Sequence, residues 1–310
     1  MCCLFGMIDY GHSFSGKQKS KMLSALAREC EERGTDASGI AYNYNNKLRI
    51  YKRPLPARQM KFHIPNGVSV VMGHTRLATQ GNAKRNYNNH PFLGRTADGF
   101  FSLCHNGVLY NDTALRKTMS LPQTRIETDS YVAVQLIEKQ STLDLNSLKY
   151  MAETVEGSFC FTAMDERDNL YFVKGDNPLC IYHYRRLGLI LYASTEAILS
   201  RGIARMKVVL GKASKVEVNC GEILKIDAYG KMSHGTFNAD SLFFPAYYPG
   251  GFRCYYPSSA SRSASFEDAY LDELRTAARY YGFDGQWVDS WYQEGLTLGE
   301  IEELLYTGEI

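Results

Sequence analysis

The chain opens with Met1-Cys2-Cys3-Leu4-Phe5-Gly6, and the interpretation of everything downstream depends on this stretch. If Met1 is removed, Cys2 becomes the amino-terminal residue and carries a thiol beside a free α-amine. The thiol is a nucleophile, and an α-amine with a usual pKa of about 7.7–8.0 is a base near neutral pH. One residue can then supply both partners of an activated nucleophile. The alternative is an ordinary buried cysteine, because cysteine is among the most buried residue types.

The bulk composition of the 310 residues is that of a globular protein. Hydrophobic residues make up 45% of the chain and charged residues 22%, which allows a core of useful size. No run of 18 apolar residues occurs, so we expect no transmembrane helix and no membrane partner. The first residues lack a basic segment followed by an apolar one, so we expect no secretory signal and a cytoplasmic location.

The eight cysteines do not form a CxxC pair, so we expect neither a metal site nor a metal-based cofactor, and nothing else in the sequence indicates a cofactor. Most of them lie in apolar, strand-like runs. Buried free thiols therefore explain them better than disulfides.

Charge is distributed unevenly along the chain. Residues 266–310 contain eleven acidic and two basic residues, so their net charge is −9 and that of residues 1–265 is +11. The imbalance predicts that this tail touches the basic body or a basic partner. The basic residues are scattered and do not interleave with aromatics, so we expect no nucleic-acid partner.

Apolar periodicity indicates an α+β domain. It predicts helices over 17–33, ending at Gly34, and over 129–139. Strand-like runs lie at 39–44, 48–51, 68–72, 100–104, 158–164, 170–173, 189–193 and 222–226. Strands bracketed by a few long helices are typical of sheets covered by helices.

The composition changes near residue 236. We predict a main domain over 2–235, a linker rich in Tyr, Pro, Gly and Ser over 236–265, and an acidic helical tail over 266–310. In the tail, Trp287 and Trp291 are four residues apart, and Thr297 with Glu300 forms a capping-box pattern.

Polar segments placed at the ends of predicted strands and helices are candidates for a functional site. Four stand out: Arg33–Gly39, Gly73–Gly81, His105–Gly107 and Thr128–Asp129.

These segments contain the groups that an amide-hydrolysing thiol needs. The oxyanion requires two donors, which the Asn106 side chain and the Gly107 backbone N–H can supply. An α-amino acid substrate requires a cation for its carboxylate, such as Arg76, and an anion for its ammonium, such as Asp129. Each has a plainer explanation: Asn-Gly is often a turn, an arginine is often a solvated surface residue, and Asp129 could cap its helix.

Taken together, the segments resemble the glutaminase domain of class II glutamine amidotransferases. This N-terminal-nucleophile family includes glucosamine-6-phosphate synthase and the amidophosphoribosyltransferase of purine synthesis. The resemblance covers roughly residues 2–235. Six motifs follow the family's order: Met1–Gly6, Arg33–Gly39, Gly73–Gly81, Asn88–Pro91, His105–Asn111 and Thr128–Ser130.

The resemblance implies a four-layer αββα sandwich of the N-terminal-nucleophile hydrolase type, here with a short C-terminal helical appendage. It also implies the catalytic groups. Cys2 is the nucleophile, its α-amine is the general base, and Asn106 and Gly107 form the oxyanion hole.

The binding residues are implied in the same way. Arg76 and Asp129 hold the head group of L-glutamine, Thr79 and His74 line or support the pocket, and Arg33 braces the amino-terminal segment. The chain departs from the family pattern at Cys3, which replaces a usual glycine, at Leu77, which replaces an aromatic residue, and at Gln80, which replaces a common histidine. None of these changes removes a catalytic group.

The expected function is that of a stand-alone class II glutamine amidotransferase. It would hydrolyse glutamine to glutamate and ammonia through a Cys2 thioester. About 75 residues follow the main domain, too few for a synthase domain, so the acceptor half is expected to be absent or to lie on another chain. Residues 266–310 could dock such a partner, cover the basic body as a lid, or be a stabilising helical appendage. Two alternatives stay open: an N-terminal-nucleophile amidase acting on another amide, and a regulatory or scaffold relative without turnover. The oligomeric state is left undecided.

Overall fold

The computed structural model describes residues 2–240, 242, 271, 274, 275, 278, 283–296, 298, 301 and 304. The chain divides into two compact units, Met1–Tyr255 and Tyr256–Ile310. Most of the predicted linker over 236–265 lies outside the described residues, as do Thr297 and Glu300 of the predicted capping box.

The first unit contains a seven-stranded antiparallel sheet, with strand order β11-β9-β10-β1-β4-β2-β3. Strand β1 lies near its middle, so the amino-terminal segment is buried in the fold. The strands are β1 (Cys3–Asp9), β2 (Ala37–Tyr44), β3 (Lys47–Arg53), β4 (Val70–Arg76), β9 (Cys180–Tyr184), β10 (Leu189–Ala193) and β11 (Ser214–Val216).

A second antiparallel sheet has six strands in the order β13-β12-β8-β7-β6-β5. These strands are β5 (Phe92–Thr96), β6 (Gly99–Leu109), β7 (Gly157–Asp165), β8 (Leu170–Lys174), β12 (Glu222–Ile226) and β13 (Met232–Thr236). The strand runs predicted from the sequence coincide with strands of the two sheets.

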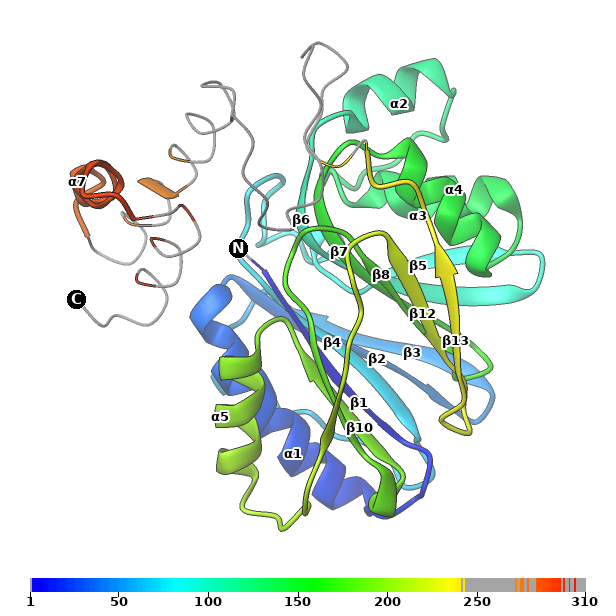
Figure 1. Cartoon of the computed structure of the whole chain (residues 1–310). Helices are drawn as coiled ribbons and strands as arrows, with labels where there is room; N and C mark the ends of the chain where they lie inside the picture. The colour runs from blue at the N-terminus through cyan, green and yellow to red at the C-terminus, as the bar shows by residue number, and fades with distance from the viewer. Residues whose placement is uncertain are drawn as a thin grey trace. The chain divides into compact units, whose positions relative to one another are not determined.

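Helices cover the outer face of each sheet (Figure 1). Helices α1 (Gly16–Glu29) and α5 (Glu196–Met206) pack on the first sheet, and α3 (Tyr131–Gln140) and α4 (Leu145–Thr154) pack on the second. The short helix α2 (Asp112–Thr118) contacts α3.

Three clusters of buried apolar side chains fill the spaces between the four layers. Alternation along β1 shows why two of them form. Phe5 and Met7 point toward the helices of the first sheet, whereas Leu4 and Ile8 point between the sheets, because successive strand residues face opposite sides. The α+β class and the αββα sandwich expected from the sequence are therefore confirmed.

The helix predicted over 17–33 is present, with a tighter final turn. Ser15 caps α1 in a capping box with Gln18, and a 3-10 turn, η1 (Cys30–Arg33), follows the last α-helical residue. Gly34 ends this turn in extended backbone with φ 177°. A Cβ atom at Gly34 would lie 2.4 Å from the carbonyl carbon of Arg76, so glycine is needed here for close approach.

The second unit contains helix α7 (Gln286–Gln293). The rings of Trp287 and Trp291 meet edge to face at 5.8 Å between centroids. Arg275 pairs with Asp289 at 2.5 Å. Among the residues that the structure describes, no helix is long and apolar enough to cross a membrane.

Most cysteines follow the expectation of free thiols. Cys2 and five buried cysteines are free: Cys3, Cys30, Cys104, Cys160 and Cys180. Cys220 is disulfide-bonded, so the expectation is wrong at this position. Unlike most of the others, Cys220 lies in a half-buried turn before β12 and not in an apolar strand.

Candidate active site

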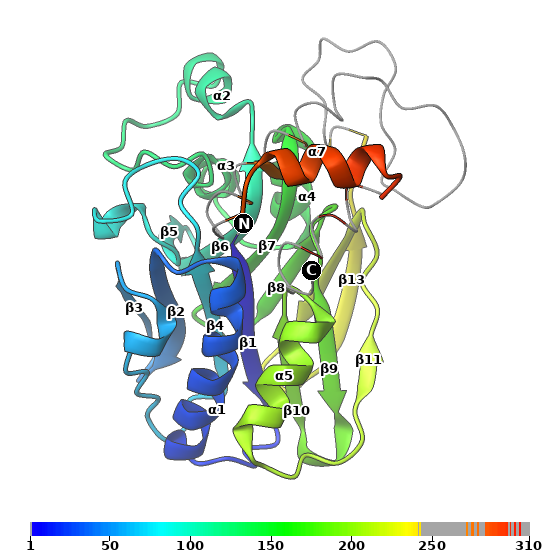
Figure 2. The same cartoon turned by 90° about the vertical axis from the view of Figure 1, so that its left-hand side faces the viewer.

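The candidate site lies where β1 begins and β4 ends (Figure 2). Cys3 is opposite Thr75 in the β1–β4 ladder, which brings the preceding residue, Cys2, to the end of β4. The Cys2 Sγ donates a hydrogen bond to the carbonyl oxygen of Leu77 at 3.4 Å. Arg33 donates from Nε to the carbonyl oxygen of Cys2 at 3.0 Å. The amino-terminal segment is therefore held on two sides.

The electrostatic surroundings keep the Cys2 thiol protonated. Burial raises the pKa of this thiol, the Arg76 guanidinium opposes that shift, and the Asp129 carboxylate adds to it. A nucleophilic Cys2 therefore needs a base to accept its proton.

The guanidinium of Arg76 is buried and held by the loop that follows β4. Its Nη1 donates to the Asn89 Oδ1 at 2.7 Å. Its Nη2 donates to the carbonyl oxygens of Gln80 and Gly81 at 2.5 and 3.3 Å. Arg76 is therefore not the solvated surface residue of the plainer explanation, and its fork has a fixed orientation.

Asp129 is also buried and lies just before α3. Its Oδ2 accepts the backbone N–H of Leu109, at the end of β6, at 2.7 Å. Ser130 occupies the N-cap position of α3, so the alternative reading of Asp129 as a helix cap is wrong. This carboxylate instead joins the start of α3 to the second sheet.

Asn106 and Gly107 lie within β6, opposite Cys160 and Phe159 of β7. The interpretation of this Asn-Gly pair as a turn is therefore wrong, because sheet pairing overrides the local preference. Asn106 is fully buried, and its Nδ2 lies 3.5 Å from the Oγ of Ser194, to which it donates. Among the described residues, the carbonyl oxygen of its side chain has no hydrogen-bond partner.

Only glycine fits at position 107. Its φ is +139°, and a Cβ atom there would lie 1.9 Å from the carbonyl oxygen of Ser158. The backbone can adopt this conformation because no side chain is present.

Ser194 connects the Asn106 side chain to the nucleophile's strand. Its Oγ accepts the backbone N–H of Leu4 at 2.9 Å, so Asn106 is linked through one hydroxyl to a residue two positions after Cys2. Cys2, Arg76 and Asp129 are near enough to influence one another electrostatically. The structure thus brings together the residues that the sequence predicted as nucleophile, oxyanion donor and head-group partners.

The other two predicted binding residues, His74 and Thr79, have different surroundings from Arg76 and Asp129. His74 is buried in β4, and its Nε2 lies 2.8 Å from the carbonyl oxygen of His105 in the other sheet. Burial lowers the pKa of His74 to about 3, so this imidazole is neutral and joins the two sheets. Thr79 is exposed on the loop after β4.

Two polar residues around the site were not among the predicted site residues. Asp36 accepts the backbone N–H of Ala78 at 2.8 Å through Oδ2, and its own N–H donates to the carbonyl oxygen of Arg76 at 2.9 Å. Ser194 contacts Asn106, as described above. Asp36 lies in the polar segment Arg33–Gly39, and Ser194 directly follows the strand-like run predicted at 189–193. These positions are the signal that the sequence offers for the two residues.

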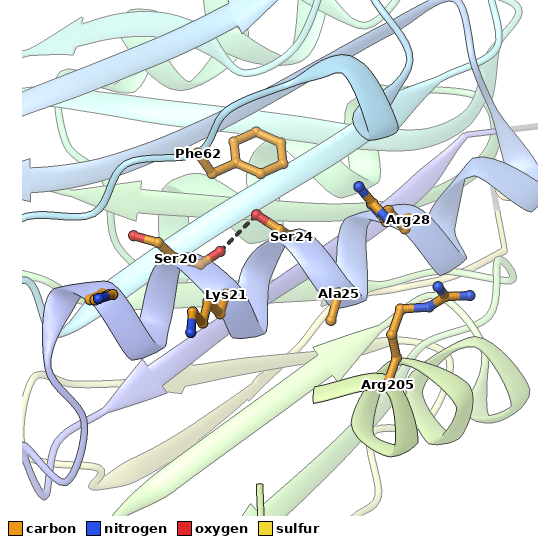
Figure 3. A pocket seen from close by; sticks show the side chains of 8 residues that line it. Ser20, Lys21, Ser24, Ala25, Arg28, Phe62 and Arg205 are labelled. Atoms are coloured by element: carbon orange, nitrogen blue, oxygen red, sulfur yellow. Dashed lines mark hydrogen bonds between the residues drawn. The ribbon is translucent and has the colours of Figure 1, made fainter. Parts of the chain in front are cut away.

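A cavity of about 400 Å³ lies elsewhere in the first unit, along α1 (Figure 3). Its lining includes Lys17, Lys21 and Arg28 from α1 and Arg205 from α5. None of the predicted site residues lines it. Among the described residues, no group of three or more His, Cys, Asp or Glu side chains could hold a metal ion.

Comparison with known proteins finds a matching domain and several relatives. Residues 74–201 match the family described as a glutamine amidotransferase domain. Glutamine–fructose-6-phosphate aminotransferase (isomerizing) of Streptococcus agalactiae is 31% identical over 190 residues, 58% of this chain and 30% of that protein. The enzyme of the same name from Sulfolobus acidocaldarius is 31% identical over 194 residues, again 58% of this chain and 31% of that protein. The chain thus spans about a third of the length of these relatives.

Solved structures show the same fold. The glutamine phosphoribosylpyrophosphate amidotransferase of B. subtilis aligns with a TM-score of 0.61 and 21% identity, covering 90% of this chain and 58% of that chain. A structure described as the allosteric regulatory enzyme of purine biosynthesis aligns with a TM-score of 0.62 and 20% identity over the same shares. By the domain match and these relatives, the chain carries a glutamine amidotransferase domain, matched over residues 74–201, and the solved amidotransferases share its fold.

Proposed function

We propose that this chain hydrolyses glutamine to glutamate and ammonia, with Cys2 as the nucleophile. The observation that supports the proposal best is the convergence of Cys2, Arg76, Asp129 and Asn106 at one end of the two sheets. Removal of Met1 would expose the α-amine of Cys2 as the base that the protonated thiol requires.

The proposed reaction has two halves. The α-amine accepts the thiol proton, and Sγ attacks the side-chain amide carbon of glutamine. The oxyanion accepts hydrogen bonds from the Asn106 Nδ2 and the Gly107 N–H. The C–N bond then breaks, the leaving nitrogen takes the proton from the α-amine, and ammonia departs. Water attacks the remaining thioester, and glutamate leaves with regeneration of the thiol.

The charges of Arg76 and Asp129 favour an α-amino acid over a peptide. Arg76 would bind the α-carboxylate and Asp129 the α-ammonium. Thr79 and His74 would support this pocket, and Arg33 would hold the backbone of Cys2 in place.

The test is an intact mass of the purified protein before and after treatment with a diazo-ketone analogue of glutamine. Loss of one methionine and a single adduct on Cys2, absent in Cys2→Ala, would support the proposal. Labelling that asparagine blocks as well as glutamine would favour an amidase for another amide. Retained Met1 without an adduct or glutamate release would favour a scaffold without turnover.

We further propose that the ammonia serves an acceptor enzyme on another chain, which docks on residues 266–310. The support is the net charge of −9 in this segment and the 44% exposure of the Trp287 side chain. Trp287→Ala should reduce recovery of the partner while the basal glutaminase rate is unchanged. Equal recovery of the partner by the unmodified protein and by Trp287→Ala would count against docking at Trp287.

A further inference from the structure

The loop that joins β4 to β5, residues 77–91, is attached at both ends to carboxylates outside it. Its start is held by the Asp36 Oδ2, which accepts the N–H of Ala78 at 2.8 Å. Its later part is held by Glu127, which lies just before α3. This loop also carries the groups that hold the guanidinium of Arg76.

Glu127 contacts the loop through both of its oxygens and its backbone. Its Oε2 accepts the Asn88 Nδ2 at 2.8 Å and the backbone N–H of Asn82 at 3.3 Å. Its Oε1 accepts the Nη1 of Arg85. The backbone N–H of Glu127 donates to the Asn88 Oδ1 at 2.9 Å. The side chain of Asn88 is therefore bound in both directions by a single residue.

The contacts between Glu127 and the loop differ in burial, and this difference indicates which of them hold the loop in place. Asn88 is fully buried, whereas the side chains of Arg85 and Glu127 are 55% and 38% exposed. An exposed ion pair contributes little because water screens it. The contacts of Oε2 are therefore the ones expected to hold the loop, with the Arg85 pair secondary.

These contacts complete a chain between the two proposed head-group residues. Arg76 binds Asn89, the neighbour of Asn88; Asn88 binds Glu127; and Glu127 is two residues before Asp129. The loop also packs closely at this point, because a Cβ atom added to Gly81 would lie 3.2 Å from the Cβ of Glu127.

We propose that Glu127 is a positioning residue that sets the spacing between Arg76 and Asp129 by holding the loop through Asn88 and Asn82. This inference rests on the proposed binding of an α-amino acid head group between those two charges. A loop released from Glu127 leaves the Arg76 fork without a fixed orientation. Substrate and transition state then lose the same binding energy, which raises KM and leaves kcat unchanged.

The experiment compares Glu127→Ala, Glu127→Gln and Arg85→Ala with the unmodified full-length protein. The Glu127→Gln side chain retains one oxygen that can accept from Asn88 and Asn82, and it loses the ion pair with Arg85. We expect KM for glutamine to rise about tenfold in Glu127→Ala, with kcat within about twofold. Glu127→Gln and Arg85→Ala should keep both constants near those of the unmodified protein.

Amide hydrogen exchange supplies a readout that does not depend on turnover. Exchange in residues 81–89 should accelerate in Glu127→Ala but not in Glu127→Gln or Arg85→Ala. Unchanged exchange in Glu127→Ala overturns the inference, whether or not the protein hydrolyses glutamine.

The kinetic outcomes separate the remaining possibilities. An equal loss in Arg85→Ala and Glu127→Ala, or a loss confined to kcat, overturns the inference. If the unmodified protein neither binds nor hydrolyses glutamine, the proposed function and the head-group role of Arg76 and Asp129 are both overturned. Faster amide exchange of the loop in Glu127→Ala would still show that Glu127 holds the loop.

Discussion

Arg33 donates a hydrogen bond from Nε to the carbonyl oxygen of Cys2 at 3.0 Å, so a buried cation from η1 holds the backbone at the start of β1. Arg33→Lys keeps the charge but loses the planar fork. We expect kcat for glutamine hydrolysis to fall about tenfold or more, because the nucleophile is misplaced, while KM changes little.

Arg58→Lys is the matched control for this change, because Arg58 contacts Glu31 of the same 3-10 turn but is 57% exposed. Steady-state kinetics of glutamine hydrolysis by Arg33→Lys and Arg58→Lys test whether Arg33 braces Cys2. Equal activity in Arg33→Lys and the unmodified protein would contradict a bracing role.

Asn106→Asp tests the oxyanion hole. The substitution keeps the size of the side chain but replaces the donating amide by an acceptor. Loss of one oxyanion donor lowers kcat by about 100- to 1000-fold, and KM should change much less. Ser194→Ala is the companion variant, since it removes the hydroxyl that Asn106 contacts at 3.5 Å and leaves the amide in place. A smaller loss is expected there, and a greater loss in Ser194→Ala would argue against Asn106 as the donor.

Asp129→Asn removes the charge of the side chain but keeps its ability to accept a structural hydrogen bond. The amide oxygen of asparagine can still accept the N–H of Leu109, a contact of 2.7 Å in this structure, so the melting temperature should change little. KM for glutamine should rise at least about tenfold, because the substrate ammonium loses its counter-charge. Asp112→Asn, which alters another buried carboxylate, serves as the control. Unchanged KM in Asp129→Asn would remove Asp129 from the head-group site.

The buried ion pair between Lys19 and Asp9 predicts a large effect on stability. The pair spans 2.8 Å, with side-chain exposures of 2% and 0%. Lys19→Met leaves the Asp9 carboxylate buried without its cation, which costs about 3–5 kcal/mol in the free energy of unfolding. Lys17→Met, on the exposed side of α1, should change it by less than about 0.5 kcal/mol. Urea unfolding of both variants measures the difference, and similar midpoints would contradict the prediction.

Buried histidines predict acid sensitivity. Burial lowers the pKa of His74 to about 3 and also lowers the pKa values of His90 and His105. Between pH 6.5 and this lowered range the unfolded chain binds more protons than the folded one. The free energy of unfolding therefore falls as the pH falls through this window, by up to about 1.4 kcal/mol per pH unit for each histidine.

His90→Phe tests this dependence cleanly. Within the part of the chain that the structure describes, both ring nitrogens of His90 lack a hydrogen-bond partner. The ring contacts that of Phe92 at 4.3 Å between centroids. The variant should show a shallower loss of stability between pH 6 and 4 in urea titrations. His63→Phe, at an exposed position, should keep the original slope. Parallel slopes for all three proteins would contradict the prediction.

Much of this fold can be predicted from local patterns. The run at 189–193 coincides with β10, because a strand buried on both faces has a short continuous run of apolar residues. The run at 222–226 coincides with β12. The collinear motifs likewise predict Cys2, Arg76, Asn106 and Asp129 as site residues, because each belongs to a motif that follows the family's order.

The partners of those residues could not be predicted in the same way. Asn106 meets Ser194 across 88 positions of sequence, and Glu127 meets Asn88 across 39. The Asn106-Gly107 pair, a turn by local preference, lies in a strand because pairing with β7 overrides that preference. These contacts depend on the register of two sheets and on how they pack face to face. Local sequence does not encode that geometry, because no window of the chain contains both partners.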